Sequence, residues 1–125
     1  MRNIEKKQDA IRNIIQRLCP DWSVKFDMSN RAKHLLGKCS YTRTRLTFYR
    51  PLFRYTLESC LHCALHEIAH VYQKAISGYS QHDKQFVEIL NMLIADYGTE
   101  EVAWSKMNRR SVATTTYTRD RCDEN

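Results

Sequence analysis

Long apolar segments are missing from the sequence. No uninterrupted apolar run reaches about 18 residues, the length that a membrane-spanning helix needs. The first residues, Met1 to Lys7, are mostly polar and contain no apolar block like that of a secretory signal peptide. We therefore expect a soluble, cytoplasmic protein that has no membrane partner.

The cysteines do not form a regular set. There are five, an odd number, at the uneven positions 19, 39, 60, 63 and 122. A disulfide framework favours an even number of cysteines in an oxidising compartment, so this pattern indicates reduced thiols inside a cell. We expect most of these cysteines to be small residues of the core.

Proline and glycine are scarce, with two and three residues, and most of them lie where the hydrophobic pattern changes. Pro20 ends a stretch of helical periodicity, and Pro51 closes a region of two-residue alternation. Gly78 and Gly98 each follow a further helical pattern. These breaks predict an N-terminal helix, a strand region and then two helices.

A chain of 125 residues is long enough for one domain and too short for a second of normal size. We expect the domain to span residues 1–108 and to include a short helix after Thr99. Residues 109–125 are polar and charged, and we expect them to form a flexible tail.

Three segments show the two-residue period of half-buried strands. They are Trp22 to Phe26, Gly37 to Tyr41 and Leu46 to Tyr49, with the polar Thr42-Arg43-Thr44 as a hairpin turn. We expect about three antiparallel strands after the first helix, which covers residues 3–18. The predicted fold class is therefore α+β.

The longest predicted helix, Leu57 to Ser77, contains His66-Glu67-Ile68-Ala69-His70. Histidines four residues apart lie one turn above each other on a helix, so both imidazoles can reach one ion. The glutamate beside the first histidine can take a proton from a metal-bound water, and the segment is therefore the zinc-peptidase motif. The far side of the helix is a continuous apolar arc that we expect in the core: Leu57, Leu61, Ala64, Leu65, Ile68, Tyr72, Ala75 and Ile76.

A third ligand is expected just after this helix. Ser80 and Asp83 match a capping box, which predicts a new helix that starts at Ser80 and carries Phe86 on its apolar stripe. His82 lies one turn before Phe86 on that stripe, and a buried imidazole needs a partner such as a metal ion. The alternative is a core histidine satisfied by a protein group.

Rival metal sites use other residues. Cys60 and Cys63 offer a closed structural zinc site together with the two helix histidines, and Glu88 offers a third ligand in place of His82. We prefer His82, because Cys60 lies well around the helix from the second histidine and Glu88 lies off the apolar stripe. His62, one turn before the motif, is expected at the rim.

Basic charge is concentrated in the first half of the chain. Residues 1–56 hold 13 Lys and Arg against 4 acidic residues, whereas residues 57–125 hold 7 against 10. The segment 31–54 has no acidic residue, and aromatic residues are interleaved with its basic ones. Such a surface suits phosphate contact and base stacking on single-stranded or distorted DNA, with Arg45 and Tyr49 outward on the third strand. The expected contact residues are Arg31, Lys33, Lys38, Arg43, Arg45, Tyr49 and Arg50. The alternative is a solvated sheet face whose arginines only aid solubility.

These features together resemble the SprT-like family of zinc peptidases, the group that includes Spartan. The resemblance rests on the His66-to-His70 motif, the step to His82 and the Gln81-to-Phe86 segment, which is similar to the family's Gly-His-x-x-x-Phe element. Weaker similarity upstream extends the match to residues 31–94. Gln81 stands where the family commonly has glycine, and only Cys122 lies downstream, so the chain resembles a short form without the family's C-terminal zinc ribbon.

The resemblance implies a minimal zincin in which His66, His70 and His82 hold Zn2+ and Glu67 is the general base. It also implies a protein substrate that is bound or crosslinked to DNA, and therefore a role in DNA–protein crosslink repair. Two other functions stay open: a basic nucleic-acid-binding module in which zinc only braces two helices, and an inactive structural zincin. Glu67 distinguishes them, because a structural zinc site has no need of this carboxylate.

Overall fold

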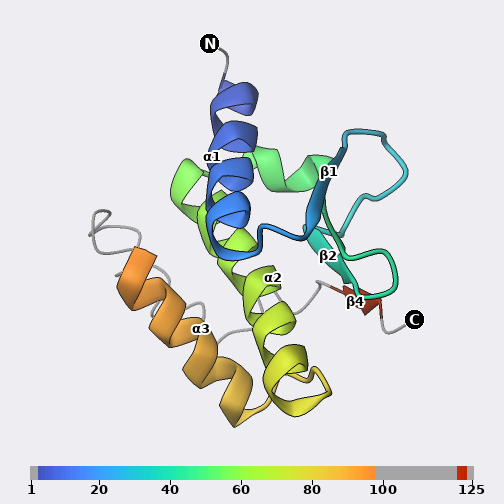
Figure 1. Ribbon diagram of the computed structural model, residues 1–125. Coiled ribbons are helices and arrows are strands. Elements are labelled where there is room, and N and C mark those ends of the chain that lie inside the picture. The colour runs from blue at the N-terminus through green and yellow to red at the C-terminus, as the bar shows by residue number, and fades with distance from the viewer. Residues whose placement is uncertain (1–2, 98–120, 124–125) are drawn as a thin grey trace.

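The computed structural model describes residues 3–97 and 121–123 (Figure 1). Its central element is α2 (Leu57–Ser77). Two helices, α1 (Asn3–Leu18) and α3 (Lys84–Tyr97), pack against α2, and the sheet lies on the side of α2 away from α3. This arrangement is an α+β fold, as the sequence predicts.

Local sequence explains where α2 begins and ends. The side chain of Thr56 caps the first turn by accepting a hydrogen bond from the backbone N–H of Ser59 at 3.2 Å. At the other end Gly78 has a φ of 78°, and its N–H donates to the Lys74 carbonyl at 2.8 Å. Glycine adopts this left-handed conformation without steric cost. The predicted bounds of the helix are therefore confirmed.

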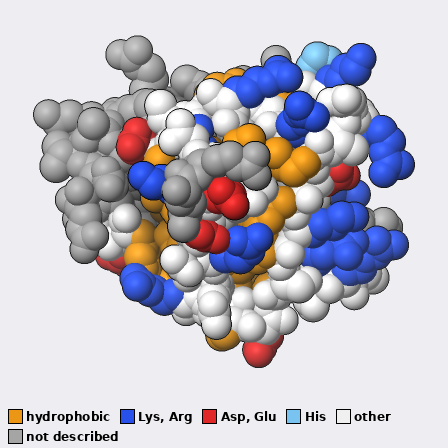
Figure 2. All heavy atoms as spheres, turned by 90° about the horizontal axis from the view of Figure 1, so that it is seen from above, with side chains coloured by type: hydrophobic (Ala, Val, Ile, Leu, Met, Phe, Trp, Pro, Cys, Tyr) orange, Lys and Arg blue, Asp and Glu red, His pale blue; other side chains and the backbone are white. Residues whose placement is uncertain are grey.

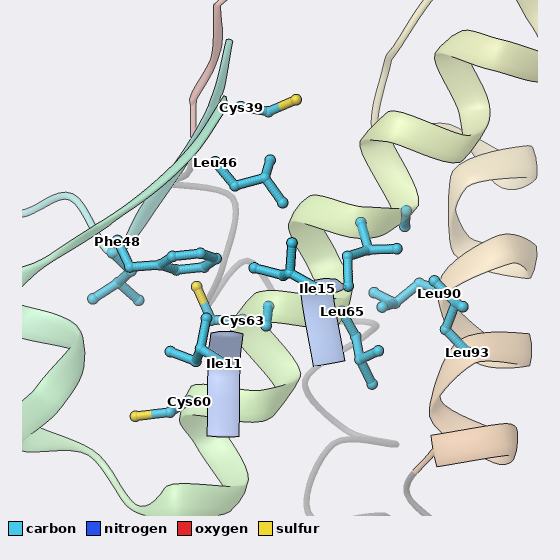
Figure 3. Packing of buried hydrophobic residues seen from close by; sticks show 14 of the residues in the cluster. Ile11, Ile15, Cys39, Leu46, Phe48, Cys60, Cys63, Leu65, Leu90 and Leu93 are labelled. Atoms are coloured by element: carbon cyan, nitrogen blue, oxygen red, sulfur yellow. The ribbon is translucent and has the colours of Figure 1, made fainter. Parts of the chain in front are cut away.

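The core lies between α2, α1 and the sheet. Ile11 and Ile15 of α1 have no exposed surface, and they point into the space between α2 and the sheet residues Leu46 and Phe48 (Figure 3). Leu90, from α3, packs on the other side of α2. Four cysteines fill gaps in this interior, as expected: Cys19, Cys39, Cys60 and Cys63.

The apolar arc predicted for α2 is buried over only part of its length. Leu65 and Ile68 have no exposed surface, but Ile76 is 67% exposed because this side of the last turn faces solvent. The prediction of a core position is therefore wrong for Ile76 and for its neighbour Ala75, which is also exposed. Within the part of the chain that the structure describes, no helix is both long and apolar enough to cross a membrane.

The sheet has the strand order β1-β3-β2-β4. Its hairpin consists of β2 (Gly37–Ser40) and β3 (Arg45–Tyr49), which pair antiparallel with Ser40 opposite Arg45. The turn contains the predicted Thr42-Arg43-Thr44, where Thr44 has a positive φ of 45°. This hairpin confirms the sequence prediction for residues 37–49. A short 3-10 helix, η1 (Arg50–Arg54), then joins β3 to α2.

The first strand, β1 (Ser23–Asp27), pairs in parallel with β3, so the expectation of a purely antiparallel sheet is wrong. Residues 28–36 carry the chain past the position that β3 later takes, and the hairpin then returns β3 between β1 and β2. Parallel neighbours need such a long connection, whereas a tight turn always gives antiparallel ones. The two-residue period identifies a strand and does not report its direction.

The last strand, β4 (Arg121–Asp123), pairs in parallel with β2. These residues belong to the segment 109–125 that the sequence predicts as a flexible tail, and their backbone is part of the sheet. The short helix predicted after Thr99 lies outside the described residues.

Two isoleucines on α2 provide a matched test of this packing. Ile68→Ala should lower the free energy of unfolding by about 2 to 5 kcal/mol, because it empties a fully buried position. Ile76→Ala should change it by less than about 0.5 kcal/mol, since that side chain faces solvent. Urea unfolding followed by circular dichroism measures both values. Equal losses in the two variants would contradict the assigned burial.

Candidate metal centre

Three imidazole rings meet at one point beside α2. His66 and His70 extend from α2, and His82 comes from the segment between α2 and α3. The Nε2 atom of His66 lies 3.2 Å from Nε2 of His82 and 3.3 Å from Nε2 of His70. All three candidate ligand atoms lie within 4.8 Å of one another. The structure therefore brings together the three histidines that the sequence analysis selects.

This spacing fits a metal ion. Nitrogen ligands at about 2.0 to 2.1 Å from a tetrahedral ion lie about 3.3 to 3.4 Å apart. The Nε2 separations of 3.2 and 3.3 Å match that edge length. His66 and His70 are buried whereas His82 is exposed, so the cluster is open to solvent on one side. A fourth ligand position can therefore accept water or substrate.

Burial keeps the histidines of this cluster uncharged. It lowers the pKa of His66 well below its ordinary value, and the neighbouring histidines add to the effect. Burial, with a smaller contribution from His82, lowers the pKa of His70 to about 3, and burial also lowers the pKa of His82. An unprotonated imidazole is the form that binds a metal, so few protons need to leave when an ion enters.

A hydroxyl group orients one of the rings. Nδ1 of His70 lies 2.6 Å from Oγ of Ser80. When Nδ1 carries the ring proton and donates it to Ser80, the lone pair of Nε2 is left for a metal. Ser80 can therefore accept the proton of the His70 tautomer that the cluster requires. The sequence analysis assigns Ser80 a different part, as the first residue of a helix.

That assignment of Ser80 as a helix cap is wrong. The helix α3 begins at Lys84, and Oδ1 of Asp83 accepts a hydrogen bond from the backbone N–H of Phe86 at 3.0 Å. Asp83 is therefore the N-cap, a position where a carboxylate also favours the positive end of the helix dipole. His82 consequently lies just before the helix and not on its apolar stripe. It still reaches the cluster, because the turn after Gly78 is short.

Gln73, buried inside α2, fastens the segment that carries His82. Its side-chain nitrogen donates to Oδ1 of Asp83 at 2.8 Å and to Oε1 of Gln85 at 3.2 Å. Its side-chain oxygen accepts the backbone N–H of Gln81 at 2.9 Å. One side chain therefore binds the chain on both sides of His82, which limits how far this ligand can move.

Phe86 supports the same cluster from α3. The centroid of its buried ring lies 4.4 Å from that of His70, 4.9 Å from that of His66 and 5.0 Å from that of His82. A ring in contact with all three imidazoles restricts their rotation and excludes water from one side. The spacing between His82 and Phe86 in the sequence thus has a structural reason.

The carboxylate of Glu67 lies under strand β2. It has no exposed surface, and a Cβ atom at Gly37 would lie 3.0 Å from Oε2 of Glu67 and 3.1 Å from Sγ of Cys63. Only a residue without a side chain lets the strand approach α2 this closely. Gly37 therefore sets the space in which the motif glutamate is held.

The rival ligands lie elsewhere. Cys60 and Cys63 are buried and point to the sheet side of α2 (Figure 3). Glu88 is exposed on α3, and within the described residues the three histidines are the only group able to hold a metal. His62 has no exposed surface, so the expectation that it lies at the rim is wrong. Because α2 is buried on several sides, the position one turn before the site is also interior.

The basic residues predicted to contact DNA are spread along the whole length of β3 and beyond it, and their contact with DNA stays a prediction. Arg43 precedes β3 and Arg50 follows it, so the two lie at opposite ends of a strand about 17 Å long. The residues of this set differ in exposure: Arg31, Lys33, Arg43 and Arg50 are exposed, and Lys38 and Arg45 are half-buried.

Tyr49 is 8% exposed, so the expectation of an outward ring beside Arg45 is wrong. Thr47, on the same face of β3, is also 8% exposed. The strand order contributes to this burial: β3 lies between β1 and β2, so side chains of both neighbouring strands flank those of β3 on the same face. The ring of Tyr49 is therefore not accessible for base stacking.

The fold and the histidine cluster define a class of protein: an α+β domain with a zincin-like metal site on its long helix. A family model described as the SprT-like family matches residues 4–105. The chain therefore belongs to the SprT-like family. The match is longer than the motif-bearing residues 31–94 and takes in α1 as well as α3. No curated protein and no solved structure matches the chain.

His82→Ala should abolish stoichiometric metal binding, because the cluster then keeps only the two ligands of α2. Glu88→Ala, on the exposed side of α3, should keep the metal and serves as the control. Elemental analysis of the purified variants measures the metal content. If His82→Ala retained the metal while Glu88→Ala or Cys63→Ala released it, the ligand assignment would be wrong.

Ser80→Ala should weaken metal affinity by about 10-fold to 100-fold, the usual cost of losing a group that orients a metal-binding histidine. Ser80→Thr keeps the hydroxyl and should bind nearly as well as the wild type. Titration in competition with a chromophoric chelator gives both affinities. An alanine variant that binds as tightly as the threonine variant would remove Ser80 from the site.

Proposed function

We propose that the protein is a zinc-dependent endopeptidase that acts on proteins bound or crosslinked to DNA. The observation that supports peptidase activity best is the position of Glu67 next to His66 in a cluster of three converging imidazoles. Zinc suits this cluster, because it takes nitrogen ligands in tetrahedral geometry and keeps one open position in catalytic sites. A structural site would close that position with a fourth protein ligand.

The roles of the residues follow from their chemistry. His66, His70 and His82 would hold the zinc ion through Nε2, with Ser80 fixing the orientation of the second ring. When bound, zinc lowers the pKa of a water molecule to about 7 and polarises the substrate carbonyl. The Glu67 carboxylate accepts a proton from the attacking water and then gives it to the nitrogen of the leaving amine. One carboxylate thus serves as base and then as acid.

A second candidate is a basic nucleic-acid-binding module in which the metal only braces α2 and α3. One observation favours it: the carboxylate of Glu67 is fully buried against β2 in this conformation. Catalysis requires this carboxylate to meet water, whereas bracing does not. The two functions therefore predict opposite outcomes when Glu67 is changed.

Glu67→Gln should retain the metal and the fold yet lose peptide cleavage by at least about 100-fold, because the amide has nearly the same shape but cannot accept the proton. Glu88→Gln makes the same chemical change at an exposed position of α3 and should cleave like the wild type. Casein or histone cleavage, measured with and without single-stranded DNA, tests both variants. Undiminished cleavage by Glu67→Gln would overturn the assigned role.

A further inference from the structure

A basic cavity lies before the start of α2, between the β1–β2 connection and η1. It encloses about 390 Å3. Ser29, Asn30 and Lys33 line it from the connection, and Arg50 and Arg54 line it from η1. None of the described residues that line it is acidic. Three cationic side chains thus converge on one concave site, and the histidine cluster contributes nothing to it.

Arg50 is held in place at this cavity. Its Nη1 donates to the Met28 carbonyl at 3.3 Å and to Oδ1 of Asn30 at 3.1 Å. These two bonds join η1 to the connection and use one of the guanidinium nitrogens, which leaves further N–H donors for a ligand. A fixed guanidinium loses less side-chain entropy on binding than a free one and matches the oxygens of a phosphate group.

The charge around the cavity favours an anion. The nearest acidic residues in the sequence are Asp27, two positions before Ser29, and Glu58, four positions after Arg54, and neither lines the cavity. Figure 2 shows Lys and Arg side chains gathered at the right, which is the sheet side of the molecule in Figure 1. Like charges that converge repel one another, and a bound phosphate reduces that repulsion.

We propose that Lys33, Arg50 and Arg54 bind a backbone phosphate of a single-stranded nucleic acid, with Tyr55 as the stacking partner of a neighbouring base. Tyr55 directly follows Arg54 and is 47% exposed, in contrast to the buried Tyr49. An exposed ring next to a phosphate-binding group is the arrangement by which proteins hold single strands without reading sequence. The chemical class of the ligand is therefore the phosphodiester of an unpaired strand.

This site is separate from the metal. The last lining residue, Arg54, lies just before Thr56, the N-cap of α2. His66 and His70 come 10 and 14 residues after Thr56, which places them about 15 and 21 Å along the helix. A nucleic-acid strand bound in the cavity therefore leaves the histidine cluster free for a protein substrate. The proposal rests on the DNA-associated part of the proposed function, and its test does not depend on peptidase activity.

The experiment measures fluorescence anisotropy of a labelled single-stranded DNA oligonucleotide across a salt series, with the full chain. Arg50→Glu with Arg54→Glu should weaken binding by at least about 10-fold and make the log–log salt slope shallower by about 0.7, since the single-strand phosphate contact that the two residues share contributes about −0.7. Lys33→Glu, in the exposed connection, is a second variant that should weaken binding even if the double variant fails to fold. The same measurement with RNA of the same sequence shows whether the site prefers the backbone of DNA or of RNA.

Matched controls separate a site from diffuse attraction. Arg17→Glu with Arg43→Glu makes the same change of charge at exposed positions on α1 and on the β2–β3 turn, and it should weaken binding less than about 3-fold at physiological salt. Tyr55→Ala should weaken binding of the single strand and leave a duplex of the same length unaffected. All cavity variants should keep the metal and their cleavage of casein without DNA.

Several results would overturn the proposal. They are wild-type protein that does not bind at low salt, equal weakening by the control and cavity pairs, and a Tyr55→Ala variant that binds both strand forms as the wild type does. Binding by a wild-type protein that does not cleave would contradict the peptidase function and leave the phosphate site intact. Cleavage without any binding would do the reverse.

Discussion

The metal cluster depends on the hydrogen bonds that fasten residues 79–83 to α2. Two ligands four residues apart on a helix need no further arrangement, because helical geometry alone aligns them. The third ligand, His82, is in place because Gln73 binds the chain on both sides of it and Ser80 reaches Nδ1 of His70. The turn at Gly78 makes this return possible. These contacts convert a pair of imidazoles into a trio in which both Nε2 separations from His66 match the edge length of a tetrahedral ion.

Function sets the composition of the buried middle of α2. Five polar side chains have almost no exposed surface there: His62, His66, Glu67, His70 and Gln73. Burial of such groups costs free energy that apolar residues would not, and a bound ion offsets part of that cost. The core around Ile11, Ile15 and Phe48 provides the rest of the support. The basic cavity lies before this helix, so α2 also separates the place where a nucleic-acid strand would bind from the place where a peptide would be cut.

Local signals predict the helices and the histidine pair, and contacts between distant residues explain what the sequence does not predict. The caps of α2 and the spacing of His66 and His70 are fixed within a few residues, so both could be inferred. Three other features depend on partners far along the chain. The parallel pairing of β1 follows from the path of residues 28–36, the burial of Tyr49 from the strands beside β3, and the use of Ser80 from His70, ten residues upstream. Gln73 had one sequence signal, a polar residue three positions after His70, but its bonding partners are set by tertiary structure.

The identity of the metal ligands is the central claim, and X-ray absorption at the zinc edge of the purified wild-type protein tests it most directly. The structure predicts a first shell of three imidazole nitrogens and one oxygen at about 2.0 to 2.1 Å, with no sulfur. A sulfur scatterer at about 2.3 Å would place Cys60 or Cys63 in the shell and contradict the three-histidine centre.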